Sequence, residues 1–222
     1  FNRIPAKWLC DYGEEPEDRH MPPRIGKYPW GPLFSLVFAA SMCKAVFMAS
    51  WQYAAAALPA MWALLLIGIS DRKYRIIPDQ FVMVLAVSGI GFAAARSQGA
   101  APLGVAALPG MAPAGYSFLS PLLGLMIGAG ILLLIGIAGK LTVKKDIMGL
   151  GDVKLAGACG LISDPYGIIV ILALSALSSA IVFAAGMLMG KIKAGDEEAL
   201  GPFIAGSAAV YLIFSQEIAQ II

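Results

Sequence analysis

The chain has 222 residues, of which 59% are hydrophobic and only 14% are charged, and its formal net charge is +2. Soluble domains carry about 25% charged residues, so this composition argues against a soluble domain and indicates a membrane protein in contact with the lipid bilayer. The small net charge and the lack of a basic tract with interleaved aromatic residues argue against a nucleic-acid partner.

The first 70 residues divide into a polar part and an apolar part. Residues 1–30 mix acidic and basic side chains and hold too few apolar residues for a core of their own, so we interpret them as a short cytoplasmic juxtamembrane segment. Residues 31–70 are almost continuously apolar and long enough for two spans of roughly 20 residues. The break between them is expected near Trp51 and Tyr53, which suit a membrane interface. The sequence begins with Phe1 and not Met, which leaves a preceding segment open.

Further apolar segments follow along the chain. The pattern predicts longer apolar helices at residues 81–95, 118–138, 167–189 and 202–214. It also predicts a loop rich in Gly, Pro and Ala at residues 96–117, and a short helix at residues 152–162 that breaks at Asp164 and Pro165. The prediction is an all-α, polytopic transmembrane helical bundle of about six to seven spans, which occupies residues 31–222. Its many Gly and Ala residues are expected to let helices pack closely.

The basic residues indicate which ends of the spans face the cytoplasm. Of the 16 Lys and Arg, all but Lys44 and Arg96 lie in four regions, which are residues 1–30, 71–79, 140–154 and 191–199. If the first region is cytoplasmic, alternating spans place the other three there as well, in agreement with the positive-inside rule. Asp71 and Asp152 are then expected on the same, cytoplasmic, side of the membrane.

These two aspartates stand at the edges of long apolar segments. Asp71 follows the segment that begins at Gly31, and Asp152 belongs to the run Gly149 to Leu155, GLGDVKL. An ionised carboxylate at the edge of a membrane span is costly and usually functional. Two carboxylates that share one proton can hydrolyse a peptide bond, because one activates a water while the other donates a proton to the carbonyl oxygen. We therefore take Asp71 and Asp152 as a candidate catalytic pair.

The helix positions of the two aspartates suggest different roles. Asp71 follows the C-terminal end of a predicted span, where the helix dipole disfavours negative charge. Asp152 opens a predicted helix, where the dipole and the free N–H groups favour negative charge. On this hypothesis Asp152 is mainly the ionised partner and Asp71 mainly the protonated one.

Neighbouring residues are candidates for supporting roles. Gly149 and Gly151 permit close backbone approach, which would let an extended substrate lie beside the second aspartate. Lys154 is expected either to favour ionisation of that aspartate or to contact lipid phosphate. Asp79, directly after Pro78, is expected to begin a helix, and a supporting role is left open for it.

Each of these residues also has a simpler interpretation. Asp152 alone is typical of a helix N-cap, Asp71 of a solvated loop charge, and Asp164 before a proline of a turn. His20 is the only histidine and the three cysteines are far apart, so neither a Ser-His-Asp triad, nor a zinc site, nor a disulfide framework is expected. We predict no metal site.

Taken together, the run Asp71 to Asp79 (DRKYRIIPD) and the GLGDVKL run resemble the two signature regions of bacterial type IV prepilin peptidases, which are Gly-x-Gly-Asp intramembrane aspartic proteases. Lys27-Tyr28-Pro29 and the segment 200–205 (LGPFIA) are similar to two further, weaker family features. The resemblance covers about residues 27 to 215. Residue by residue, it matches Asp71 and Asp152 to the catalytic pair of that family and makes residues 31–222 a transmembrane aspartic peptidase domain.

The resemblance implies cleavage of the basic leader from prepilins and pseudopilins, at the cytoplasmic face of the inner membrane and with no cofactor. Many bacterial relatives also methylate the new N-terminus with S-adenosylmethionine, through an N-terminal region that often carries paired cysteines. Residues 1–30 are then a candidate remnant of that region. Because Cys10 stands without a Cys-x-x-Cys partner, the sequence does not decide whether the chain methylates its product. It does not indicate an oligomeric state either.

Three alternatives remain. A presenilin-like protease with other membrane substrates would place a Pro-Ala-Leu-Pro motif in a late helix, whereas the late helix here begins at Gly201-Pro202. A small ion-coupled transporter would often show repeated halves, and we find no convincing internal repeat. A non-catalytic membrane scaffold would have no use for paired aspartates at the membrane boundary.

Overall fold

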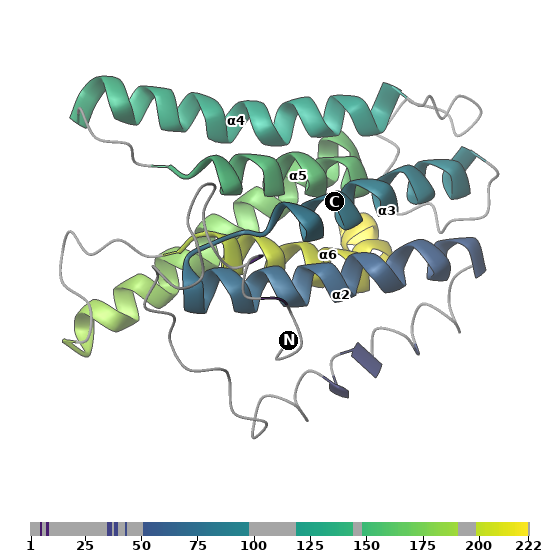
Figure 1. Cartoon of the computed structure of the whole chain (residues 1–222), viewed down its shortest axis with the longest axis horizontal. Coiled ribbons are helices and arrows are strands. Elements are labelled where there is room, and N and C mark those ends of the chain that lie inside the picture. The colour runs from purple at the N-terminus through teal and green to yellow at the C-terminus, as the bar shows by residue number, and fades with distance from the viewer. Residues whose placement is uncertain are drawn as a thin grey trace.

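The computed structural model is all-helical in the part of the chain that it describes (Figure 1). That part comprises residues 51–97, 119–143, 148–190 and 199–221, together with single positions between 5 and 43. It contains five helices, which are α2 (Trp51–Tyr74), α3 (Asp79–Ser97), α4 (Leu119–Val143), α5 (Leu150–Leu188) and α6 (Gly201–Ile221). The predicted N-terminal segment 1–30 lies almost entirely outside the described residues, and so do most of the first predicted span and most of the predicted loop 96–117. The first two residues of that loop belong to α3.

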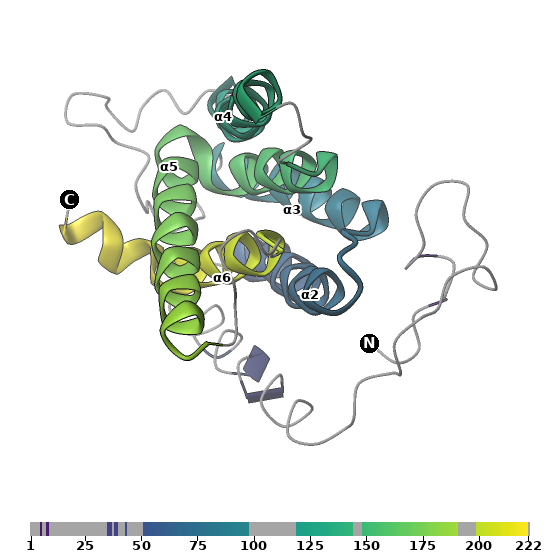
Figure 2. The same ribbon diagram turned by 90° about the vertical axis from the view of Figure 1, so that its left-hand side faces the viewer.

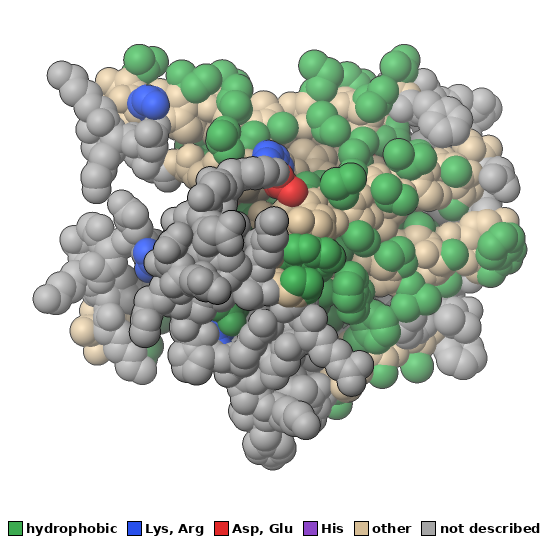
Figure 3. Space-filling view, viewed as in Figure 1, with side chains coloured by type: hydrophobic (Ala, Val, Ile, Leu, Met, Phe, Trp, Pro, Cys, Tyr) green, Lys and Arg blue, Asp and Glu red, His purple; other side chains and the backbone are tan. Residues whose placement is uncertain are grey.

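Four of the five helices are long and apolar enough to cross a membrane, and α6 contains a shorter apolar stretch, Gly201–Phe214. α2, with 24 residues, is about 36 Å long, which exceeds a hydrocarbon core of about 30 Å. Figure 3 shows hydrophobic side chains spread over the described surface with few charged side chains among them, which suits a lipid environment. The all-α, membrane-embedded class is thus confirmed, while the number of six to seven spans stays a prediction.

Small residues let α4 and α5 lie against each other. A Cβ atom at Gly124 of α4 would collide with the carbonyl oxygen of Gly160 of α5, and one at Gly160 would collide with the backbone of Gly124. One turn further along α4, a Cβ at Gly128 would lie 2.5 Å from the Ala156 carbonyl oxygen. Such spacing is how membrane helices gain dispersion contacts where no hydrophobic effect drives association. The close packing predicted for the Ala- and Gly-rich segment of α5 is therefore confirmed.

The helix α5 consists of two rods joined at Asp164. This residue has φ 62° and ψ 177°, a conformation that non-glycine residues rarely adopt, and Pro165 follows it. The break predicted at Asp164 and Pro165 is confirmed, because the second rod leaves in a new direction and returns toward the end of the bundle where α5 began (Figures 1 and 2).

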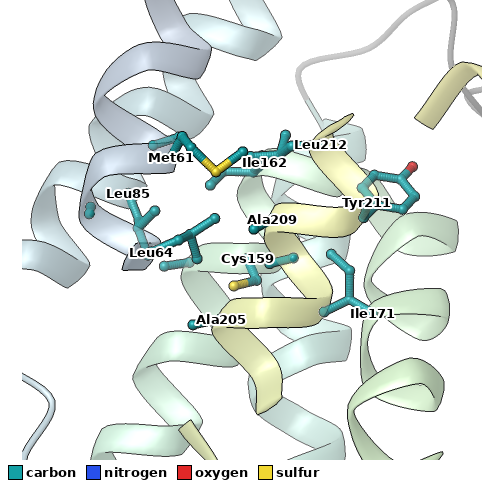
Figure 4. Close-up of a cluster of buried hydrophobic side chains, with 14 of the residues drawn as sticks. Met61, Leu64, Leu85, Cys159, Ile162, Ile171, Ala205, Ala209, Tyr211 and Leu212 are labelled. Atoms are coloured by element: carbon teal, nitrogen blue, oxygen red, sulfur yellow. The ribbon is translucent and has the colours of Figure 1, made fainter. Parts of the chain in front are cut away.

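The core lies where α2, α3, α5 and α6 meet. Its side chains, ten of which are labelled in Figure 4, include the fully buried Leu64, Cys159 and Ile171. The Tyr53 ring packs edge to face on Phe92 with centroids 4.9 Å apart, and this contact joins α2 to α3. Because this core holds the four helices together, it also fixes how their ends meet on one side of the bundle.

Candidate active site

Three helix ends converge at one end of the bundle, on the left in Figure 1. They are the last turn of α2, which carries Asp71, the first turn of α5, which carries Asp152, and the first residue of α6, which is Gly201. Ile77, in the connection between α2 and α3, contacts both α5 and α6. A Cβ at Gly151 would lie 3.3 Å from its Cβ, and one at Gly201 would lie 3.1 Å from its Cδ1.

Asp71 is held inward by the way α2 ends. Arg75 adopts φ 55° and its N–H donates to the Asp71 carbonyl oxygen at 2.9 Å, which is the left-handed termination that glycine usually provides. The Ser70 hydroxyl donates to the Ile76 carbonyl oxygen at 2.9 Å and fastens the following residues to the helix. Asp71 is therefore only 6% exposed, which contradicts its simpler interpretation as a solvated loop charge.

Asp152 is the third residue of α5. Gly149 caps this helix in an extended conformation, and the N–H of Asp152 donates to the Gly149 carbonyl oxygen at 3.2 Å. The carboxyl group turns back over the cap, since its Oδ2 would lie 3.7 Å from a Cβ on Gly149. The prediction that Asp152 opens a helix is confirmed, although Gly149, and not the aspartate itself, is the N-cap residue.

The two carboxyl groups lie at the same end of the bundle, where Ile77 lies against both Gly151, next to Asp152, and Gly201, next to the Asp71 carboxyl group. They lie close enough for their charges to interact. Among the described residues, Asp71 Oδ2 and Asp152 Oδ1 are buried and have no hydrogen-bond partner. Two buried carboxyl groups with unpaired oxygens can share a proton and can bind a water or a carbonyl group between them, which is the arrangement that acid–base hydrolysis requires.

The charges around Asp71 differ from the expected ones. Besides standing in the last turn of α2, Asp71 lies beside the backbone amide of Gly201, at the N-terminus of α6, and near the positive charge of Arg75. Both aspartates therefore lie at a helix N-terminus, Asp71 at that of α6 and Asp152 at that of α5, and helix N-termini favour negative charge. The helix ends therefore do not separate an ionised from a protonated partner, and the assignment of roles stays a prediction.

The four supporting residues lie at this same end of the bundle. Lys154 donates to both carboxylate oxygens of Asp79 at 3.0 Å, a pairing that the sequence did not predict. An effect of Lys154 on the ionisation of Asp152 stays a prediction. Asp79 begins α3, as predicted. Gly151 faces Ile77, so the close approach that it permits is to the connection after α2. A direct contact of Gly149 or Gly151 with substrate stays a prediction.

Two features escaped the sequence reasoning. Gly201 was noted as the start of the last helix and as part of the segment 200–205 that resembles a family feature, but nothing in one sequence places it against Asp71. Asp164 was interpreted as a turn, yet it is buried and pairs with Arg96, whose Nη2 also donates to the Ile162 carbonyl oxygen at 2.8 Å. The signal that could have indicated this pair was the lone Arg96 near the end of an apolar segment.

Within the described ranges, no three His, Cys, Asp or Glu side chains come together as metal ligands would. The absence of a metal from the reaction stays a prediction from the sequence.

The model of the type IV leader peptidase family matches residues 58–185, which is more than half of the chain and includes both aspartates. No curated protein matches. No solved structure matches either.

Proposed function

Because this chain belongs to the type IV leader peptidase family, a family of prepilin peptidases, we propose that it is an aspartic endopeptidase whose catalytic residues are Asp71 and Asp152. Its substrates are type IV prepilins and pseudopilins, from which it removes the basic leader at the cytoplasmic face of the inner membrane. The family membership itself makes the chain a membrane peptidase; the aspartic mechanism, the residues and the side of the membrane belong to the proposal.

One observation carries the assignment of the catalytic pair. Two acidic side chains 81 positions apart in the sequence lie at one end of an apolar bundle, and each has one buried oxygen, Asp71 Oδ2 and Asp152 Oδ1, without a hydrogen-bond partner among the described residues. A buried polar group without a partner costs about 1–3 kcal/mol, so such an arrangement persists where function needs it. The matched family residues enclose both aspartates, which supports the same conclusion.

The mechanism follows from one proton shared by two carboxyl groups. The ionised carboxylate takes a proton from a water, and the oxygen of that water attacks the scissile carbonyl carbon. The protonated carboxyl group gives its proton to the carbonyl oxygen, so a neutral tetrahedral diol forms. The carboxyl group that took the proton from water then gives it to the amide nitrogen, while the other carboxylate takes a proton from a hydroxyl of the diol. The C–N bond breaks, which leaves a new carboxyl end on the leader and a new amine on the pilin. The pair again holds one proton.

The placement at the cytoplasmic face is supported by the distribution of charge. Lys154 and Asp79 lie at the same end of the bundle as the two aspartates, as do the basic residues of the last turn of α2. Positive residues concentrate on the cytoplasmic side of membrane proteins. A leader rich in Lys or Arg also remains in the cytoplasm, so the peptide bond and the aspartates would meet on the same side.

N-terminal methylation is a separate question. It would require S-adenosylmethionine and a binding site for it, and the region proposed for this activity, residues 1–30, lies almost entirely outside the described residues. We therefore propose the peptidase reaction alone as the activity of residues 31–222, with no cofactor.

The proposal is tested with purified protein in detergent and a prepilin that carries a basic leader. Asp71→Asn and Asp152→Asn keep the side-chain shape and remove the shared proton, so each should lower kcat by at least about 1,000-fold. Ser97→Ala, whose exposed hydroxyl bonds only within its own helix, serves as the control and should cleave like the parent chain. If either Asn variant retained a tenth of the parent activity, that aspartate would be excluded from the mechanism.

A further inference from the structure

Gly201 is the first residue of α6 and lies directly against the carboxyl group of Asp71. A Cβ atom at position 201 would collide with Asp71 Oδ2 and would lie 2.9 Å from Asp71 Cγ. The same atom would lie 3.1 Å from Ile77 Cδ1. No other side chain therefore fits at this position while Asp71 keeps its place.

The contact brings the N-terminus of α6 to the aspartate. Leu200 caps this helix, because its carbonyl oxygen accepts from the N–H groups of Phe203 at 3.0 Å and Ile204 at 3.2 Å. The N–H groups at the start of a helix carry a partial positive charge, and the amide of Gly201 is the one that faces the carboxyl group. Asp71 itself is 6% exposed, and its Oδ2 is without a hydrogen-bond partner in the described part of the chain.

From these contacts we infer that Gly201 is a positioning residue of the peptidase site. Its missing side chain lets the N-terminus of α6 close over Asp71 and fix the carboxyl group in front of Asp152. This inference rests on the proposed function, and it adds a third helix, α6, to a site whose two proposed catalytic residues stand on α2 and α5.

The steric argument predicts a loss of activity without a loss of the fold. The atoms that block a methyl group at position 201 are mainly the tip of the Asp71 side chain, which can rotate, and not a rigid backbone. In Gly201→Ala the carboxyl group should turn aside while the helices stay in place. A displacement of about 1 Å at a reacting group can lower the rate about 100-fold.

The first arm of the test is kinetic and compares Gly201→Ala with Gly206→Ala, the same change on the same helix. No described atom lies within 4 Å of a Cβ at Gly206, so that variant should cleave prepilin like the parent chain. We expect Gly201→Ala to lower kcat about 100-fold with KM nearly unchanged, because the substrate still binds while the acid–base pair is misaligned. Equal kcat values for the two variants would overturn the inference.

The second arm does not depend on activity. It measures Tm for Gly201→Ala in the parent chain and in an Asp71→Ala chain, where the carboxyl group that the added methyl group would meet is gone. The effects of substitutions at contacting residues are not additive. The change in Tm caused by Gly201→Ala should therefore be about 2–4 °C more positive in the Asp71→Ala chain than in the parent chain. An identical Tm change in both backgrounds would refute the contact, even if Gly201→Ala proved too unstable for kinetics. If the parent chain cleaved no prepilin, the proposed function would be wrong, but the Tm comparison would still show whether Gly201 contacts Asp71.

Discussion

The guanidinium group of Arg96, near the end of α3, forms a buried ion pair with the carboxylate of Asp164 at the kink of α5. The two side chains are 9% and 6% exposed. The first rod of α5, from Leu150 to Asp164, has a length of about 21 Å, so this pair lies far from the two aspartates at the other end of the rod. The pair joins α3 to the point where α5 reverses, and it therefore stabilises the helix arrangement on which the site depends.

Removal of either partner of this pair should destabilise the protein strongly. Arg96→Met leaves a buried carboxylate and Asp164→Asn leaves a buried guanidinium, and each change should lower the free energy of unfolding by about 3–5 kcal/mol. The double variant should lose less than the sum of the two, since it leaves no uncompensated charge. Thermal unfolding in detergent measures all three. Additive losses would contradict a direct ion pair.

The glycine contact between α4 and α5 gives a second prediction. In Gly124→Ala the new methyl group meets the Gly160 carbonyl oxygen and the Asp164 backbone, which cannot move without separating the helices. We expect a loss of about 1–3 kcal/mol in stability. Gly130→Ala, on the same helix and with no described atom within 4 Å of the new Cβ, is the control and should be neutral or slightly stabilising. The difference in Tm between the two variants tests the packing.

The exposed ion pair beside the site should contribute little to stability. Lys154 and Asp79 have side chains that are 48% and 32% exposed, and exposed pairs contribute at most about 1 kcal/mol. Lys154→Met should therefore change the free energy of unfolding by less than about 1 kcal/mol, and its cleavage rate should stay within about 10-fold of the parent. A loss of activity as large as that of Asp152→Asn would show instead that Lys154 acts in the reaction.

The buried thiol in the core offers a test of the fold itself. Cys159 is fully buried where α2, α5 and α6 meet, whereas Cys43 is exposed. In a chain where Cys10 and Cys43 are replaced by Ser, a maleimide should label Cys159 only after the protein is unfolded. Rapid labelling of the folded chain would contradict the packing of this core. The same assay shows whether the variants above keep their folds.

Much of the fold follows from local signals in the sequence. The apolar segments, the break at Asp164 and Pro165 and the start of α3 after Pro78 were all predicted, because lipid requires long apolar helices and proline interrupts them. The family was also identified correctly, because its motifs are short and contiguous. The charged pairs were not predicted, neither that of Lys154 with Asp79 nor that of Arg96 with Asp164.

The sequence by itself determined that this chain is a helical membrane protein with two acidic residues at span edges and the motifs of a leader peptidase. Only the tertiary structure decided which residues meet: Gly201 with Asp71, Arg96 with Asp164, and Gly124 with Gly160. The physical reason is that helix formation and membrane insertion depend on neighbouring residues in the chain, whereas the space beside a carboxyl group is set by whichever distant helices pack there.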